Sequence, residues 1–196
     1  MPPKTLVLAS RSPRRLALLR QIGLSPRVLP CDIPEDFDPS LSAAGNARLL
    51  AVKKAKTVAA SLDDAIVLGA DTIVAIDGLL LAKPADRDDA IRMLGMLSGR
   101  THTVFTGFAL VDRPSDRIID GVEETRVTFR LMTPEEISDY TDSGSPMDKA
   151  GAYGIQDDFG AVFVSRIEGC FYNVVGLPLS RVYSALKELC TPVNQR

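Results

Sequence analysis

The chain has 196 residues, 45% of them hydrophobic, and is long enough to bury a core of its own. Its formal net charge of −2 at pH 7 argues against broad binding to nucleic acid, which depends on many contacts between basic side chains and phosphate. The three cysteines, Cys31, Cys170 and Cys190, fit neither a disulfide framework nor a zinc site. No apolar run approaches the ~18 residues of a membrane span, and we expect a cytoplasmic protein without a signal peptide or membrane association.

The first thirty residues predict a strand followed by a helix. The apolar run over residues 5–9 indicates the strand, and a helical pattern follows over 13–22. Ser12 is placed to cap this helix, Pro13 suits its first position, and Gly23 is placed to end it. The expected apolar face of the helix consists of Leu16, Leu19 and Ile22.

Polar and basic residues surround the start of this predicted helix. A helix N-terminus already offers free backbone N–H groups and a partial positive charge, to which serine hydroxyls and arginines add. Phosphate is the anion that such a group suits. The alternative is an ordinary capped surface helix with solvated arginines. The residues concerned are Ser10, Arg11, Ser12, Arg14 and Arg15.

The rest of the chain continues to alternate between strands and helices, so the sequence predicts one α/β or mixed α+β domain over residues 1–196. A turn is expected at Asp77-Gly78, and a flexible polar loop over 32–45 that could cover a cleft. The further helices are expected over 46–61, 86–97, 133–140 and 178–189, the last but one opening with a capping box, and the further strands over 65–76, 103–111, 121–131 and 161–167.

Asp71 lies within an otherwise apolar strand, where an unpaired charge would cost several kcal/mol. It therefore needs a partner. We interpret it as a metal ligand or a general base directed into a cleft. The alternative is a carboxylate in a bend at the end of a strand, bonded to the backbone.

Two further groups could take part in chemistry. Lys83 follows a strand and precedes a helix, where its ammonium could meet a phosphate or simply be solvated. Residues 145–156 form a loop of small residues that holds Asp148, Lys149 and Gln156. Its glycines would allow the backbone to approach a ligand closely, although such a loop can also be a plain connector.

Several common catalytic designs are missing. His102 is the only histidine, so histidine-rich metal clusters are excluded, and we expect this residue to be structural. The chain has neither the Gly-x4-Gly-Lys-Ser/Thr phosphate loop nor the Gly-x-Gly-x-x-Gly dinucleotide fingerprint. A P-loop nucleotidase and a Rossmann dehydrogenase are therefore not supported.

Six motifs, in order along nearly the whole chain, resemble those of the Maf family of nucleoside triphosphate pyrophosphatases, also called septum formation proteins. The sequence over 149–156 is similar to the branch that acts on dTTP and UTP rather than 7-methyl-GTP. The motifs are Leu8-Ala9-Ser10-x-Ser12-Pro13-Arg14-Arg15, Gly69-Ala70-Asp71-Thr72, Lys83-Pro84, Ser98-Gly99-Arg100-Thr101-His102 with Thr106, Asp148-Lys149-Ala150-Gly151-Ala152-Tyr153-Gly154-Ile155-Gln156, and Val175-Gly176-Leu177-Pro178-Leu179.

The resemblance implies a fold and an activity. The fold would be that of Maf and inosine triphosphatase, a central mixed sheet flanked by helices with a cleft between two lobes. The reaction would be hydrolysis of dTTP or UTP to the monophosphate and pyrophosphate in nucleotide house-cleaning. A divalent cation would be needed, Mg²⁺ first, with Mn²⁺ and Co²⁺ as alternatives. The enzyme would be a cytoplasmic homodimer.

The resemblance also implies roles for individual residues. Asp71 would accept the proton of the attacking water, with Lys83 beside it in the catalytic set. The carboxylates of Glu35, Asp71 and Asp148 would bind the metal ion. Substrate would be bound by Ser10, Ser12, Arg14, Arg15, Lys54, Thr72, Lys83, Lys149 and Gln156, of which Arg14, Thr72 and Gln156 would govern substrate choice.

Two segments depart from the family pattern. Residues 42–46 replace an acidic stretch, and Asp157-Asp158-Phe159-Gly160 is longer and more acidic than usual, which is expected to affect the approach to the base.

Other functions stay open on sequence grounds. Purine or modified nucleotides are alternative substrates, because pocket shape decides base choice. A nucleotide-binding regulator of cell division without turnover is a second alternative. A kinase or nucleotidyltransferase is a third, although no acceptor site is recognisable.

Overall fold

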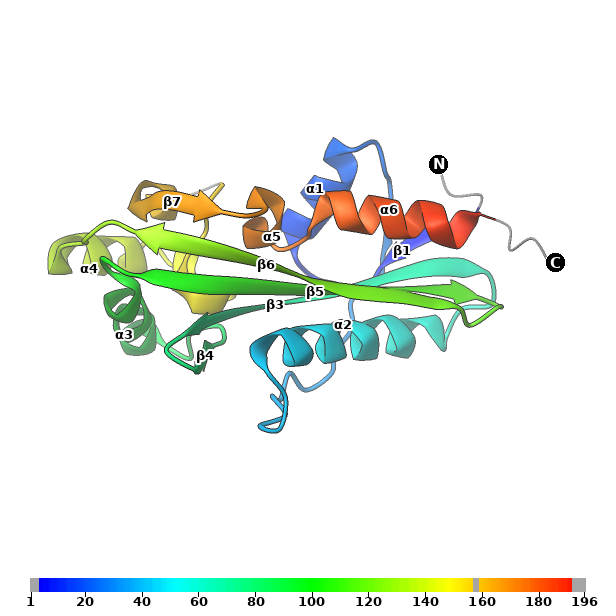
Figure 1. Cartoon of the computed structure of the whole chain (residues 1–196), viewed down its shortest axis with the longest axis horizontal. Coiled ribbons are helices and arrows are strands. Elements are labelled where there is room, and N and C mark those ends of the chain that lie inside the picture. The colour runs from blue at the N-terminus through cyan, green and yellow to red at the C-terminus, as the bar shows by residue number, and fades with distance from the viewer. Residues whose placement is uncertain (1–3, 157–158, 192–196) are drawn as a thin grey trace. The chain divides into compact units, whose positions relative to one another are not determined.

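The structure of the protein is a computed structural model that describes residues 4–156 and 159–191. The chain forms two compact units. The first unit consists of Met1–Asp71, Thr106–Glu123 and Gly176–Arg196, and the second of Thr72–Phe105 and Glu124–Val175. Each is described separately below. The long strands β3 (Ala65–Ile76), β5 (Thr101–Arg113) and β6 (Ile118–Phe129) contribute residues to both units (Figure 1).

The strands form a mixed sheet, as the sequence predicts. The hydrogen-bonded order is β2-β1-β3-β5-β6-β7, and β4 pairs with β3 outside this path. Strand β1 (Leu6–Leu8) runs parallel to both β2 (Arg27–Val28) and β3. Strands β4 (Leu79–Leu81) and β7 (Val164–Glu168) pair antiparallel with β3 and β6. The β3–β4 turn is the expected Asp77-Gly78 pair, both with positive φ.

The helices account for most of the remaining elements. The long ones are α1 (Pro13–Gln21), α2 (Ala43–Ala59), α3 (Arg87–Leu97), α4 (Pro134–Asp142) and α6 (Leu179–Cys190), with a short α5 (Phe171–Val175) before the last. Three 3-10 turns, η1 (Ser145–Asp148), η2 (Ala150–Ala152) and η3 (Phe159–Phe163), lie between α4 and β7.

In the first unit, helices cover both faces of the strands. A Cβ added at Gly107 of β5 would meet the backbone of α2, so this face of the strand lies directly on that helix. The next residue, Phe108, points to the opposite face because side chains alternate along a strand, and Arg181 of α6 lies over its ring. Figure 1 shows α2 and α6 on either side of these strands. A core of small and β-branched residues fills the α2 side, including Ala51, Ala55, Val67 and Ala109.

The second unit has its own core, in which aromatic side chains are prominent. The rings of Phe129 and Tyr153 meet edge to face with centroids 4.7 Å apart, and Tyr140 meets Phe163 in the same way at 5.3 Å. Aliphatic side chains of α3, including Met93, Leu94 and Leu97, complete this cluster. Capping of α4 by Thr133 and Glu136 occurs as a capping box, as predicted.

Helix α1 has the predicted ends, and its buried face agrees with the prediction only in part. Ser12 caps it, and Gly23 adopts positive φ after the last turn. Ile22 is exposed, however, whereas Arg15 is buried together with Leu18 and Leu19. Of the predicted face, Leu19 is buried and Leu16 is half-buried, so the prediction is wrong for Ile22 alone. It also misses Arg15, which is buried where its guanidinium bonds to the carbonyl oxygen of Gly176.

Other element boundaries also differ from the predictions, among them the starts of α2 and β7. Helix α2 begins at Ala43 rather than residue 46, because Ser42 caps it by accepting a hydrogen bond from Gly45 N (3.1 Å). Residues 161–163 belong to the 3-10 turn η3 rather than to a strand, and β7 begins only at Val164.

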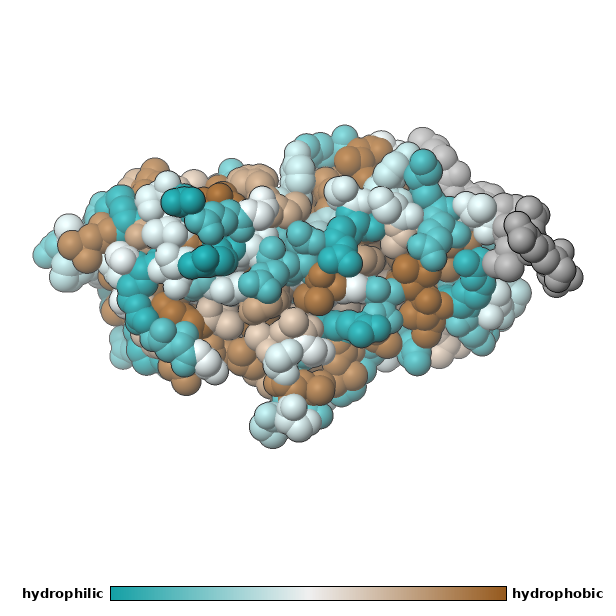
Figure 2. Space-filling view, in the orientation of Figure 1, coloured by the Kyte–Doolittle hydropathy of each residue, from teal (hydrophilic) through white to brown (hydrophobic). Residues whose placement is uncertain are grey.

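The surface is mixed in character. Figure 2 shows hydrophilic and hydrophobic residues interspersed over the face in view. Among the described residues, no helix is both long and apolar enough to span a membrane. Of the acidic departure noted in the sequence, Asp157 and Asp158 lie outside the described residues.

Candidate functional site

The N-terminus of α1 brings serines and an arginine together in the first unit. Ser10 Oγ accepts hydrogen bonds from Ser12 N (3.2 Å) and from Arg15 Nη1 (3.1 Å). Arg15 Nε donates to the carbonyl oxygen of Gly176 (2.8 Å), which precedes α6. The guanidinium thus joins two segments that are distant in sequence. The arrangement places a buried cation beside a helix N-terminus, and both features favour an anion.

A buried lysine bridges two carboxylates in the same unit. Lys54 Nζ lies 2.6 Å from Asp71 Oδ1 and 2.5 Å from Glu35 Oε1. The side chains of Lys54 and Asp71 are only 8% and 9% exposed, whereas that of Glu35 is 44% exposed. The prediction that Asp71 needs a partner in its apolar strand is therefore confirmed, and the partner is Lys54 of α2.

Glycines allow α2 to approach the sheet closely enough for this contact. A Cβ at Gly69 would lie 2.6 Å from Ala55 N of α2 and closer still to Ala51 O. Gly69 and Asp71 share a face of β3 because side chains alternate along a strand. On α2, Lys54 is three residues beyond Ala51 and therefore lies next to it along the helix surface. The close approach at Gly69 thus places Lys54 over Asp71.

The charges of this cluster act on one another. Burial raises the pKa of Asp71 above its ordinary value, and the positive charges of Lys54 and Arg15 oppose this rise without cancelling it. Burial lowers the pKa of Arg15, which the negative charges of Asp71 and Glu35 partly offset. A buried carboxylate with a raised pKa, held beside cations, has the features of a general base.

The carboxylates could also hold a metal ion. Among residues 4–156 and 159–191, no group of three or more His, Cys, Asp or Glu side chains is arranged to hold a metal by itself. Glu35 and Asp71 nevertheless direct oxygens at one point, the ammonium of Lys54. Mg²⁺ is commonly bound by one or two carboxylates completed by water and a phosphate ligand. The number and type of these carboxylates suit an ion bound in that way, which would take the place of the Lys54 ammonium between them.

In the second unit, contacts of Gly151 place the segment 149–156 beside residues that are close in sequence to Lys83 and Thr72. Gly151 N donates to Ala82 O (3.0 Å), so the segment 149–156 lies beside the residue that precedes Lys83. A Cβ at Gly151 would lie 2.9 Å from Val74 Cγ2, and Val74 is two residues beyond Thr72 on β3. The positive φ of Gly151 (70°) suits glycine for a second reason. Lys83 is exposed, and Thr72 and Gln156 are half-buried.

The side chains of Lys149 and Asp148 contact each other. Lys149 Nζ donates to Asp148 Oδ1 (2.9 Å) and to Ser145 Oγ (3.2 Å), and its side chain is 11% exposed. The Asp148 carboxylate is 58% exposed. Arg14, at the N-terminus of α1, is half-buried in the first unit.

His102 has the structural role expected for it. It is 1% exposed, and burial lowers its pKa to about 4, so the ring is neutral at pH 7. Its Nε2 forms a hydrogen bond with Tyr153 Oη (2.8 Å), and Tyr140 Oη accepts one from Gly154 N (3.2 Å). These two contacts hold the centre of the segment 149–156, which ends at Gln156.

Some contributions to the site are not evident from the sequence. The carbonyl of Gly176 is a partner of Arg15, Gly107 lies against α2, and Asn46 holds the loop that carries Glu35. The motif around Gly176 gives a signal for the first of these. Nothing local identifies the other two, because their partners are elsewhere in the chain.

Comparisons with known proteins agree with the six motifs. The family model described as Maf-like protein matches residues 5–189. A dTTP/UTP pyrophosphatase of Chlorobium phaeovibrioides is 49% identical over 188 residues, 94% of this chain and 96% of that protein. One from Moorella thermoacetica is 51% identical over 183 residues, 92% of this chain and 93% of that protein. The chain therefore belongs to the Maf-like protein family.

Proposed function

We propose that this protein hydrolyses dTTP and UTP to the nucleoside monophosphate and pyrophosphate. The observation that carries the proposal is the buried contact of Lys54 with Asp71 and Glu35, in the unit that also holds the serine and arginine group of α1. Relatives that are 49% and 51% identical over nearly their whole length are named dTTP/UTP pyrophosphatases, which supports the same substrates here.

Asp71 acts as the general base in this proposal. Its carboxylate takes a proton from water, and the water adds across the anhydride bond between the α- and β-phosphates. Lys54 holds the carboxylate in place and favours its ionised form. A positioned general base contributes about 10²–10⁴-fold to rate, so most of the remaining acceleration must come from charge stabilisation.

The cations of the first unit bind the triphosphate. A nucleoside triphosphate carries up to about four negative charges, and preorganised cations in a water-poor site stabilise their redistribution in the transition state. Arg14, Arg15 and Lys54 supply charge, and Ser10 and Ser12 supply hydroxyls at the N-terminus of α1. The small negative net charge of the whole chain is compatible with this local basic group.

A divalent cation, with Mg²⁺ the first choice, is part of the proposal. Glu35 and Asp71 would bind it, with Asp148 as the third carboxylate that the family resemblance implies. When bound, the ion would polarise the phosphate oxygens and neutralise part of their charge. Residues of the second unit keep the roles implied by the resemblance, substrate choice for Thr72 and Gln156 and phosphate binding for Lys83 and Lys149. The homodimer and the cytoplasmic location stay predictions.

A nucleotide panel tests the substrate. We would measure pyrophosphate release from dTTP, UTP, CTP, dATP, GTP and 7-methyl-GTP, with Mg²⁺ and with EDTA. The expected result is release that depends on Mg²⁺ and is fastest with dTTP and UTP. A preference for a purine nucleotide would contradict the proposed branch, and full activity in EDTA would contradict the metal requirement.

A further inference from the structure

Asn46 lies in the first turn of α2, and its side chain is fully buried. All the hydrogen bonds of this side chain are with backbone atoms of the residues just before the helix. Its Oδ1 accepts from Asp38 N (2.7 Å), and its Nδ2 lies within hydrogen-bond distance of Asp38 O (3.0 Å), Leu41 O (3.2 Å) and Ser42 O (3.2 Å). The residue is 0% exposed. Buried amides are normally satisfied at both ends, and here the residues just before the helix supply all four of these partner atoms.

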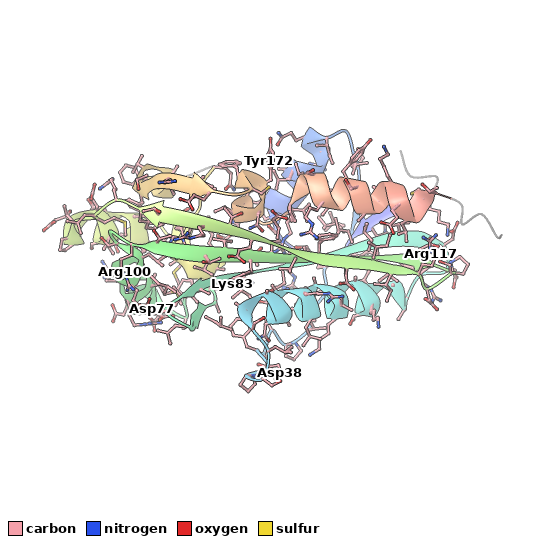
Figure 3. All side chains as sticks on the ribbon, viewed as in Figure 1. Asp38, Asp77, Lys83, Arg100, Arg117 and Tyr172 are labelled. Carbon is pink, nitrogen blue, oxygen red and sulfur yellow. The ribbon has the colours of Figure 1, made fainter. Side chains whose placement is uncertain are left out.

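The contact with Asp38 is reciprocal, like a pair of residues in neighbouring strands. The side-chain oxygen of Asn46 accepts a hydrogen bond from the backbone N–H of Asp38, and its side-chain nitrogen donates one to the carbonyl oxygen of the same residue. Asp38 is itself fixed in a turn, because its carboxylate accepts from Ser40 N (2.9 Å) and Ser40 Oγ (2.6 Å). Figure 3 shows Asp38 in the loop next to the start of α2. One end of the loop is thereby fastened to the helix.

The contact between Asn46 and Asp38 is important because the rest of this loop has no regular secondary structure. Residues 29–42 contain neither helix nor strand, and Glu35 within them is exposed. Loops of this kind are held by few contacts and open at low free-energy cost. A fixed Asp38 leaves Glu35 only three residues from an anchor, which reduces the chain entropy that the contact with Lys54 must overcome.

The dimensions of the two segments agree. Lys54 follows Asn46 by eight residues on the same helix, a rise of about 12 Å. Three extended residues from Asp38 back to Glu35 span at most about 10 Å, and the two side chains cover the remainder. With Asp38 anchored at the first turn, Glu35 therefore stays close enough to reach Lys54.

We propose that Asn46 is a positioning residue that holds the acidic loop against α2 and so keeps Glu35 on Lys54. Asn46 acts through Glu35 and does not itself touch the reacting groups. This inference rests on the proposed function for its effect on turnover, but not for the structural link between Asn46 and the loop.

A double-mutant cycle tests the link in turnover. Asn46→Asp keeps the side chain's shape and its acceptor for Asp38 N, but loses both donors. We expect kcat/KM for dTTP to fall about tenfold, with part of the loss as a raised KM for Mg²⁺. Glu35→Gln lowers activity on its own. Because Asn46 acts through Glu35, the double variant is expected to match Glu35→Gln within about twofold, as coupled residues do. Losses that multiply would overturn the proposal.

Thr141→Val is the matched control for simple destabilisation. It removes a buried hydrogen bond, from Thr141 Oγ1 to Ile137 O (2.8 Å), within α4 of the second unit. We expect it to lower the melting temperature, leave kcat/KM unchanged, and combine multiplicatively with Glu35→Gln. If the Asn46 variants behave in the same way as this control, their role is structural only and the proposal fails.

Amide hydrogen exchange tests the link without any turnover. In the wild-type protein, the N–H of Asp38 is expected to exchange as slowly as the amides in the middle of α2, because a buried acceptor holds it. Asn46→Ala is expected to speed that exchange and that of residues 35–37, and to leave α2 unchanged. Exchange of the wild-type Asp38 amide at the rate of an unprotected peptide would overturn the proposal, even if no nucleotide were hydrolysed.

Discussion

Replacing Gly69 by alanine changes the distance between α2 and β3 without touching any polar side chain. The new Cβ would lie 2.6 Å from Ala55 N and closer still to Ala51 O, and ordinary van der Waals contact begins at 3.4 Å, so the helix must move by at least about 0.8 Å. Backbone atoms form the obstacle, and no flexible side chain can turn aside. A shift of that size would take the 2.6 Å contact of Lys54 with Asp71 to about 3.4 Å, beyond a good hydrogen bond.

Two effects are expected from this displacement. Overpacking of this kind costs about 1–3 kcal/mol of folding free energy, and in a chain of this length each kcal/mol lowers the melting temperature by about 2–4 °C. Misplacement of a catalytic group by about 1 Å can cost up to about 10²-fold in rate, so kcat for dTTP is expected to fall roughly 10- to 100-fold. Steady-state kinetics well below the melting temperature separates the two effects.

Gly95→Ala is the matched control. Gly95 is exposed on α3, and a Cβ there would meet nothing within 4 Å. Alanine is favoured over glycine inside helices by up to about 1 kcal/mol, so the control is expected to be slightly more stable and fully active. A Gly69→Ala protein with the kcat and melting temperature of the wild type would refute the idea that this glycine sets the Lys54–Asp71 distance.

Four further results are expected. Asp71→Asn should lower turnover at least ~100-fold with the fold intact by circular dichroism, the scale of losing a positioned base, and near-normal turnover would remove Asp71 from that role. Burial raises the pKa of Asp71, and only its ionised form accepts a proton. As the pH is lowered, kcat/KM should therefore begin to fall at a higher pH than it would for an ordinary aspartate. A pH–rate profile without this fall on the acidic side would contradict the role of Asp71 as the general base. Lys83→Ala, at an exposed position, should weaken triphosphate use and spare the melting temperature, and unchanged kinetics would exclude Lys83 from the site. Tyr153→Phe removes the hydrogen bond of His102 with Tyr153, at a cost of about 1–3 kcal/mol of folding free energy. Because this contact holds the segment that ends at Gln156, the variant should show a smaller preference for UTP over CTP. An unchanged preference would mean that other contacts hold the segment 149–156.

Local patterns predict the elements of this fold well, because their signals lie within a few residues. Ser12, Pro13 and Gly23 mark both ends of α1, and the capping box marks the start of α4. The burial of Arg15 on α1 was not predictable in this way. Arg15 is buried because Gly176, 161 residues away, offers a carbonyl oxygen to its guanidinium. Helical periodicity contains no information about such a partner.

The site shows the same division between local and long-range information. The cost of a charge in an apolar strand predicts that Asp71 has a partner. The identity of that partner as Lys54 depends on how α2 lies on β3, which Gly69 and Gly107 permit and which no periodicity encodes. Asn46 illustrates the limit most clearly, because a helix prediction that starts at this residue misses both the true cap, Ser42, and the loop that Asn46 holds.

The central proposal is tested most directly by identifying both products formed from dTTP in the presence of Mg²⁺, for the wild-type protein and for Asp71→Asn. We predict that the wild type releases dTMP and pyrophosphate in equal amounts, and that the Asp71→Asn protein, folded as before, releases at least ~100-fold less of both. Formation of dTDP and inorganic phosphate, or the absence of any turnover in the wild type, would contradict the proposed reaction.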